Sequence, residues 1–295
     1  MGQRRTAQQK RREKVTEKAA RPAKGTLFII GGREDKKDER AILSEIARRV
    51  DSGKLIIATL ATEYADKSWE LYKRIFTSLG VQQIGHLSIE RRDEETEDAN
   101  LELIEGAKAI FFTGGDQLKF ITKLGGTRLS EEIEQIFLRG GIIAGTSAGA
   151  TAMGEMMLIP ELSNHLHTVR DAFQMVPGLG MIKNVIIDQH FSERGRIRRL
   201  LGAVAQNPRM IGIGIDEDTA VVVSKEESFR VIGSGAVYVA DGRGLTHTNI
   251  SQNSLDRAMS VFNIRLHILS GNDSYDLKAH QPISDDLDSA TLKKA

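Results

Sequence analysis

Residues 140–150 read Gly140-Gly141-Ile142-Ile143-Ala144-Gly145-Thr146-Ser147-Ala148-Gly149-Ala150, an apolar run that ends in a turn of small residues. The apolar run predicts a short buried strand, and Ser147 follows it with a glycine two residues to either side. Glycines at this spacing permit a strained strand-to-helix turn that presents a serine hydroxyl as a nucleophile. An ordinary tight turn has the same pattern, so the motif alone leaves both interpretations open.

The residues after this turn favour the nucleophile interpretation. Residues 150–153 can begin a helix, whose free N–H groups and positive dipole end would lie beside the serine. A second small-residue loop, Gly114-Gly115-Asp116-Gln117, also follows a strand and opens a helix. The N–H groups of Gly115 and Ala148 could together form an oxyanion hole.

Strands alternate with helices on both sides of this stretch, from residue 26 to residue 215. This alternation predicts an α/β fold with a doubly wound, mostly parallel sheet flanked by helices. After about residue 219 the pattern changes to short strands joined by turns, which predicts an antiparallel β extension at the C-terminal end. The expected strands are 26–30, 54–59, 81–87, 109–113, 142–144, 185–188, 211–215, 220–224, 229–232, 236–240 and 261–269, and the expected helices are 39–50 (capped by Asp38), 67–79, 98–106, 116–124 and 130–138.

The composition limits the kinds of function. The chain has 295 residues and no cysteine, which excludes disulfides, thiolate nucleophiles and cysteine-based metal sites. With no H-E-x-x-H motif either, we expect no metal and no cofactor. No run of 18 apolar residues exists and the first residues lack an apolar signal region, so we expect a cytoplasmic protein without a membrane partner.

The charge divides the chain into a tail and a domain. Residues 1–24 carry nine Lys or Arg and two Glu, a net charge of +7, whereas the remainder carries 32 basic and 38 acidic residues, a net charge of −6. We expect residues 1–24 to be a disordered, solubilising tail, although a basic tail can also bind an anionic polymer or nucleic acid. Residues 25–270 are predicted to form a single α/β domain, and residues 271–295 a flexible tail.

A nucleophilic serine needs a base and an acid that orients it. His190 is the best candidate for the base, because it follows the expected strand 185–188 and should lie at the sheet edge that carries Ser147. His165 and His167 lie in a polar loop and are weaker candidates. The acid could be Asp188, Asp216 or Glu217, and the spacing along the chain does not choose among them.

Four arginines crowd the segment after His190. Guanidinium groups bind carboxylates with two parallel hydrogen bonds, so these arginines suit a substrate that carries carboxylates, although a solvated helix face would show the same pattern. The four are Arg194, Arg196, Arg198 and Arg199.

Five motifs, spread over residues 25–240, together resemble the cyanophycinase and peptidase E family of serine peptidases. They are Gly31-Gly32, Thr113-Gly114-Gly115-Asp116-Gln117, Gly145 to Ala150, Asp188-Gln189-His190-Phe191 with the arginines behind it, and Gly214 to Ala220. The resemblance implies the fold of class I glutamine amidotransferases, with Ser147 as nucleophile, His190 as base, Glu217 as the acid, and Gly115 and Ala148 as oxyanion donors. It also suggests a homodimer.

Within this family, the Asp-Gln-His-Phe motif with its arginines and the length of the chain are more similar to cyanophycinases than to peptidase E. Cyanophycinases cleave the polyaspartate backbone of cyanophycin, whose side chains carry arginine in isopeptide linkage, to β-aspartyl-arginine dipeptides. The alternatives are a dipeptidase of the peptidase E type and a non-catalytic binder of an anionic polymer; nucleic acid is not an expected partner. The resemblance implies that substrate contacts come from Asp116, Gln117, Asp188, Gln189, Arg194, Arg196 and Arg199.

Overall fold

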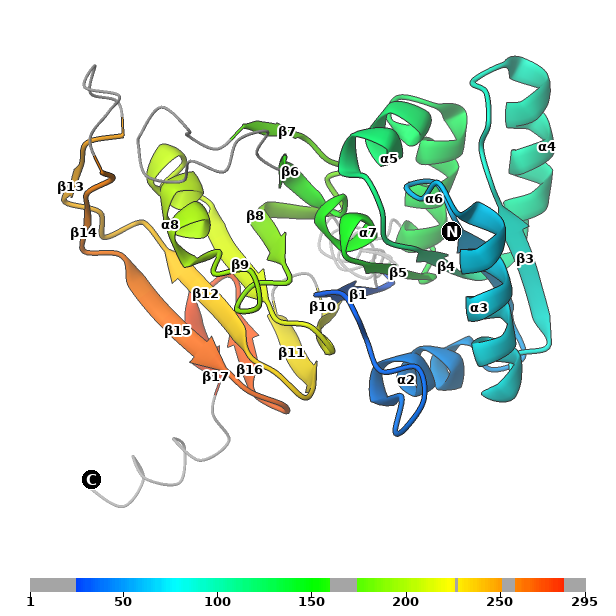
Figure 1. Cartoon of the computed structure of the whole chain (residues 1–295), viewed down its shortest axis with the longest axis horizontal. Coiled ribbons are helices and arrows are strands. Elements are labelled where there is room, and N and C mark those ends of the chain that lie inside the picture. Colours follow the sequence, from blue (N-terminus) through cyan, green and yellow to red (C-terminus); the bar gives the residue numbers. More distant parts are fainter. Residues whose placement is uncertain (1–24, 160–173, 226–227, 251–257, 284–295) are drawn as a thin grey trace, which may run out of the picture.

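The protein is described by a computed structural model that covers residues 25–159, 174–225, 228–250 and 258–283. Its strands form two large sheets, of nine and six strands, and one two-stranded ribbon. Figure 1 shows most helices gathered on the side of the first strands, while the later strands extend on the opposite side.

Parallel strands form one half of the nine-stranded sheet. β1 pairs in parallel with β5, β5 with β4, β4 with β2, and β2 with β3. Antiparallel strands complete the sheet on the other side of β1, in the order β10, β11, β16 and β17. The bounds are β1 Thr26–Ile30, β2 Lys54–Ala58, β3 Gln83–Leu87, β4 Ala107–Phe112, β5 Ile142–Thr146, β10 Thr219–Lys225, β11 Ser228–Gly233, β16 Ser274–Asp276 and β17 Gln281–Ile283.

The six-stranded sheet has a parallel centre and antiparallel edges. β6, β8 and β9 are parallel to one another, whereas β7 pairs antiparallel with β6, β12 with β9, and β15 with β12. The two-stranded ribbon joins β13 to β14. The bounds are β6 Gly154–Leu158, β7 Met175–Pro177, β8 Ile182–Gln189, β9 Ile211–Ile215, β12 Val237–Asp241, β13 His247–Thr248, β14 Val261–Phe262 and β15 Arg265–Leu269.

Alternation along β1 explains how the layers stack. Leu27 and Ile29 face a core shared with β8, β9 and four helices, whereas Phe28 and Ile30 face a second core beneath α2 and α3. The outer face of the six-stranded sheet is partly covered by α8. The helices are α2 Ala41–Val50, α3 Ala65–Ser78, α4 Glu94–Ile104, α5 Gln117–Leu124, α6 Arg128–Leu138, α7 Ala148–Thr151 and α8 Ile197–Gln206.

The predicted α/β fold with its C-terminal antiparallel strands is confirmed, but the parallel strands do not form one continuous sheet. The free edge of β1 is occupied by β10, which pairs with it antiparallel from Leu27–Val223 to Ile30–Ala220. β8 and β9 therefore cannot join that sheet and form the centre of the second one. Sequence periodicity identifies a buried strand but does not say which neighbour it pairs with.

Three other predictions differ from the structure. The cap of α2 is not Asp38: the N-cap residue is Arg40, which makes no side-chain cap hydrogen bond and whose own N–H is donated to Asp35 at 2.7 Å. The expected strand 261–269 is divided into β14 and β15. The chain from 271 to 283 is not a flexible tail, because β16 pairs with β11 and buries Tyr275.

Residues 1–24 and 284–295, and His165 with His167, lie outside the described residues. Within the ranges that are described, no helix is both long and apolar enough to cross a bilayer.

Candidate active site

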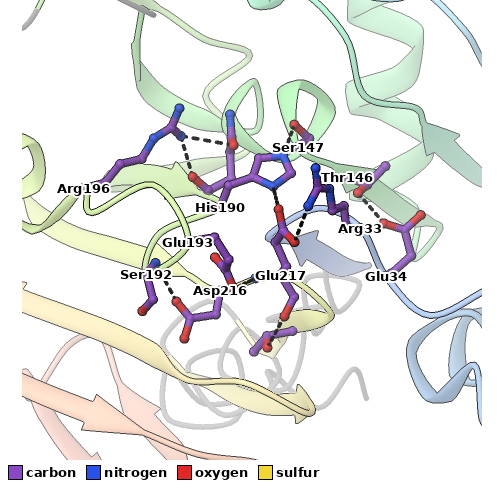
Figure 2. A network of polar contacts seen from close by, with 12 residues as sticks. Arg33, Glu34, Thr146, Ser147, His190, Ser192, Glu193, Arg196, Asp216 and Glu217 are labelled. Carbon is purple, nitrogen blue, oxygen red and sulfur yellow. Dashed lines mark hydrogen bonds and ion pairs between the residues drawn. The ribbon is translucent and has the colours of Figure 1, made fainter. Parts of the chain in front are cut away.

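Ser147 lies in a strained turn between β5 and α7. Its backbone has φ 54° and ψ −112°, a conformation that L-residues rarely adopt outside functional sites. The turn lifts the side chain toward the second sheet, where Ser147 Oγ lies 2.9 Å from His190 Nε2 (Figure 2). Local sequence accounts for this turn, because the neighbouring small residues leave room for it.

His190 and Glu217 come from the second sheet. His190 directly follows β8, and Glu217 lies in the turn after β9. His190 Nδ1 is 2.6 Å from Glu217 Oε1, so a proton on Nδ1 would be donated to the carboxylate, leaving Nε2 as the acceptor for the serine hydroxyl. Figure 2 shows the three side chains in one line of hydrogen bonds. Such a chain can move a proton from a serine to an imidazole.

The turn that follows β1 holds the three segments together. Three successive carbonyl groups, those of residues 30–32, each accept one backbone N–H from the segments that carry the serine, the histidine and the glutamate. The pairs are Ser147 N–H to Ile30 O at 3.0 Å, His190 N–H to Gly31 O at 2.8 Å and Asp218 N–H to Gly32 O at 2.9 Å. The predicted meeting of Ser147 and His190 is therefore made across two sheets, and not along one sheet edge.

Gly32 allows the imidazole ring to approach the backbone. Its φ is 106°, and a Cβ built there would lie 2.3 Å from Cε1 of His190. Any side chain at this position would collide with the ring and be strained as well.

The surroundings of His190 favour the neutral imidazole. Burial lowers the pKa of His190 below its ordinary value of 6.5, and the positive charges of Arg194 and Arg196 act in the same direction. The hydrogen bond to Glu217 opposes this shift. A neutral imidazole is the form that can accept the serine proton.

Gly115 and Ala148 belong to the two small-residue loops that meet at the serine. Gly114, the neighbour of Gly115, lies against Ser147, since its built Cβ would be 3.2 Å from the serine Cβ. Gly115 has φ 146°, and a Cβ there would lie 2.3 Å from Ala61 O. Neither the Gly115 nor the Ala148 N–H has an acceptor within the described residues, so both are open to a ligand oxygen.

Asp116 and Gln117 differ in whether their side chains have hydrogen-bond partners within the protein. Asp116 Oδ1 caps α5 by accepting the N–H groups of Leu118 at 2.7 Å and Lys119 at 2.9 Å. Gln117 is only 2% exposed, and neither polar atom of its amide has a partner among the described residues. A buried amide without partners is costly, so Gln117 remains a candidate for a contact with a ligand.

Among the described residues, no hydrogen bond or ion pair joins Asp188 to His190. Its carboxylate is fully buried and lies between two guanidinium groups, with Arg196 Nη1 at 2.9 Å and Arg199 Nε at 3.1 Å. The Arg199 pair is an ion pair without the alignment of a hydrogen bond. Burial raises the pKa of Asp188, and the two arginines oppose that rise.

Several residues expected to contact the substrate are already paired within the protein. Asp188, one of the residues expected to contact the substrate, already pairs with two guanidinium groups of the protein itself. Arg196 also donates to the backbone and side-chain oxygens of Gln189, and Arg199 to Leu158 O at 3.2 Å. Of the three arginines predicted to bind substrate, Arg194 alone is exposed.

Asp216 and two residues of the turn after β1 complete the surroundings. Asp216 accepts the N–H groups of Ser192 at 2.9 Å and Ala236 at 3.2 Å, so it braces two loops and does not orient the base. Arg33 Nη1 lies 3.3 Å from Glu217 Oε2, and the side chain of Arg33 is 76% exposed. Glu34 is buried behind the serine turn. Sequence reasoning missed Arg33 and Glu34, although both follow the Gly31-Gly32 motif directly.

The structure offers no evident metal centre: in the described part of the chain, no group of three His, Asp or Glu side chains is placed to bind one ion.

Comparison with known proteins gives the class. The sequence model for peptidase family S51 matches residues 27–231, which include the serine, histidine and glutamate described above. The chain therefore belongs to peptidase family S51 and is a peptidase.

Curated relatives carry a more particular name. The chain is 36% identical over 264 residues to a cyanophycinase of Geminocystis herdmanii, a match that covers 88% of this chain and 97% of the relative. It is 38% identical over 258 residues to a cyanophycinase of Nostoc sp., covering 86% of each chain. A cyanophycinase of Thermosynechococcus vestitus is 35% identical over 261 residues, covering 88% of this chain and 81% of the relative.

Solved structures support the fold. A peptidase from an acI-B1 actinobacterium superposes with a TM-score of 0.60 at 22% identity, covering 87% of this chain and 98% of that one. A putative peptidase E from Listeria monocytogenes superposes with a TM-score of 0.52 at 16% identity, covering 72% of this chain and all of the other. At these identities the likeness concerns the fold alone.

Proposed function

We propose that this protein is a serine peptidase that hydrolyses the polyaspartate backbone of cyanophycin to β-aspartyl-arginine dipeptides. The observation that carries the proposal is the hydrogen-bond chain from Ser147 through His190 to Glu217, in a member of family S51 whose relatives are named cyanophycinases.

The reaction proceeds in two steps. Ser147 Oγ attacks the scissile carbonyl carbon while His190 Nε2 takes the hydroxyl proton, and Glu217 stabilises the imidazolium that forms. The N–H groups of Gly115 and Ala148 receive the negative charge on the carbonyl oxygen. His190 then gives its proton to the leaving amine. Water attacks the acyl-enzyme in the second step, with His190 again as the base, and regenerates Ser147.

The substrate carries an arginine on each aspartate, so every repeat presents one carboxylate and one guanidinium group. The exposed guanidinium groups of Arg33, which pairs with Glu217, and of Arg194, whose charge acts on His190, suit the carboxylate. The unpartnered amide of Gln117 provides both a donor and an acceptor. Asp116, although it caps α5, is exposed and can face the substrate guanidinium. The end of β8 is held in place by the ion pairs of Asp188 with Arg196 and Arg199, which do not face the substrate.

The test measures the release of β-aspartyl-arginine from purified cyanophycin by the wild-type chain and by Ser147→Ala. We expect the variant to lose a factor of about 10⁴–10⁶ in kcat. Undiminished release would refute the role of Ser147.

A second assay tests the alternative functions with Asp-X dipeptides as substrates. Faster turnover of these dipeptides than of cyanophycin would favour a dipeptidase of the peptidase E type. Tight polymer binding without hydrolysis would favour a binding protein.

The homodimer and the cytoplasmic location stay predictions. Light scattering on the purified chain tests the first, and fractionation of the source cells tests the second.

A further inference from the structure

A buried carboxylate lies directly behind the nucleophile turn. Glu34, in the loop that leaves β1, is 2% exposed. Its Oε2 accepts the hydroxyl of Thr146 at 2.6 Å, and its Oε1 accepts the hydroxyl of Tyr72 and lies 3.0 Å from Lys36 Nζ. Figure 2 shows Glu34 and Thr146 beside, but outside, the line of hydrogen bonds that contains Ser147.

The proposed reaction makes no direct use of Glu34. Its carboxylate has no contact with Ser147, His190 or Glu217 among the hydrogen bonds and ion pairs of the described residues. Removing a carboxylate from water is costly even when it is well paired. The groups that bind the Glu34 carboxylate therefore indicate which part of the structure it supports. One of them, Thr146, is the last residue of β5 and the direct neighbour of Ser147.

The serine turn needs support from its surroundings. Ser147 has φ 54°, and strained residues of this kind persist only where neighbouring groups hold them. The hydroxyl of Thr146 is fixed to Glu34, which restricts the side chain and the peptide group that precedes Ser147. Tyr72 is part of α3 and ties the same carboxylate to the helix layer, away from the turn.

The other residues of this loop contact the turn that carries Glu217. Arg33 lies 3.3 Å from Glu217, and Asp35 N–H is donated to Asp218 Oδ1 at 2.7 Å. The loop 33–35 thus touches the nucleophile turn of one sheet through Glu34 and the acid-bearing turn of the other sheet through Arg33 and Asp35.

We propose that Glu34 is a positioning residue for the reaction: through Thr146 it holds the Ser147 turn at the place where Oγ meets His190 Nε2. This inference rests on the proposed function. A carboxylate that serves only the stability of the fold would act equally through Tyr72 and Thr146, whereas a positioning carboxylate acts on the serine through Thr146 alone.

The experiment compares Thr146→Val with Tyr72→Phe in the full chain, because each removes one hydroxyl from the same carboxylate. The probe is a small serine-reactive fluorophosphonate, and the labelling rate of Ser147 is followed by intact mass and normalised to the folded fraction. We expect Thr146→Val to slow labelling about ten- to a hundredfold, because small displacements of a reacting group carry large rate costs. Tyr72→Phe should label within about twofold of wild type.

Two further variants sharpen the result. Thr146→Ser keeps the hydroxyl and should restore labelling to within about threefold of wild type. Glu34→Gln should lower kcat on cyanophycin by about tenfold or more while KM stays nearly unchanged, because positioning affects the chemical step. Glu45→Gln, which removes an ion-paired carboxylate from α2, is the matched control.

The outcomes separate the two proposals. If wild type labels and Thr146→Val labels as fast, the positioning role is refuted and the proposed function stands. Equal slowing by Thr146→Val and Tyr72→Phe would also refute it, in favour of a purely structural carboxylate. If wild type fails to label at all, the proposed function falls, and this inference falls with it. Should Thr146→Val fail to fold, Glu34→Gln decides: unchanged labelling and kcat refute the role.

Discussion

Two clusters of charged side chains lie at the end of β8, and they differ in the partners and the exposure of their carboxylates. Around His190, the carboxylate of Glu217 holds the imidazole and is 17% exposed at its side chain. Around Asp188, the carboxylate lies between Arg196 and Arg199 and is 1% exposed. The first cluster is open to a ligand at the serine, whereas in the second the carboxylate is paired entirely with guanidinium groups of the protein itself.

The backbone at His190 separates the two clusters. Asp188 and His190 are two residues apart, a spacing that places side chains on the same face of a regular strand. β8 ends at Gln189, however, and His190 has φ 48°, so the chain turns and the ring points away from Asp188 toward Ser147 and Glu217. An acid that is near a histidine in sequence is therefore not its partner in space.

Among the variants that compare the two clusters, the largest expected effect comes from Glu217→Gln. An amide at this place cannot stabilise the imidazolium, so kcat should fall by about 10³–10⁴-fold, while the free energy of unfolding should change by less than about 1 kcal/mol because the group is partly exposed. The measurements are cyanophycin hydrolysis and urea unfolding. Glu97→Gln, a half-buried ion-paired carboxylate of α4, is the control. A near-normal kcat in Glu217→Gln would refute the view that the Glu217 cluster serves the reaction and the Asp188 cluster serves stability.

Asp188→Asn should show the opposite pattern. Removing the charge leaves two buried guanidinium groups without their counter-ion, which should lower the free energy of unfolding by about 3–5 kcal/mol. Urea unfolding measures this loss, and fluorophosphonate labelling of the folded fraction should stay within about tenfold of wild type. Asp98→Asn, in an exposed pair with Arg128, should cost less than about 1 kcal/mol. A stable Asp188→Asn that has lost its labelling would assign Asp188 to the chemistry.

Gly32→Ala tests how closely the imidazole depends on the backbone beside it. The new Cβ would lie 2.3 Å from His190 Cε1, so the ring must move, and we expect the labelling rate of Ser147 to fall about a hundredfold. Gly126→Ala is the matched control, since Gly126 also has a positive φ, of 70°, but nothing lies within 4 Å of its Cβ position. Equal labelling by the two variants would show that the collision with the imidazole does not affect the reactivity of Ser147.

The smallest effect should come from Arg194→Gln. The positive charge of Arg194 lowers the pKa of His190, so its removal raises that pKa, and the base becomes protonated at higher pH. The labelling rate rises with pH through the pKa of His190, below 6.5 in wild type, and this limb should move to higher pH in the variant. The ratio of the rates at pH 6 and pH 8 should fall about twofold at low salt and less in 1 M salt.

Arg198→Gln is the control for this measurement, because Arg198 is exposed on α8 and is not among the charges that shift His190. A shift of the limb to lower pH in Arg194→Gln would contradict the electrostatic account.

Local patterns predicted much of the fold and part of the site. The apolar run before Ser147, the small residues around it and the Gly114-Gly115 loop each carry their structural meaning within a few residues, because strands, turns and helix starts depend on neighbours in sequence. Local patterns could not decide whether Asp188 or Glu217 orients His190. It depends on the conformation of His190 and on which strands pair, and both are set by contacts between distant segments.

The sequence by itself determined the order of strands and helices, the turn that presents Ser147 and the family motifs around it, since periodicity and small-residue turns are local properties. Only the tertiary structure decided that β10 would occupy the edge of β1, that Arg196 and Arg199 would turn inward to Asp188, and that Glu34 would lie behind Thr146. The reason is physical: strand pairing and the burial of a charge depend on the groups that the whole fold brings near, and those groups lie far away in the sequence.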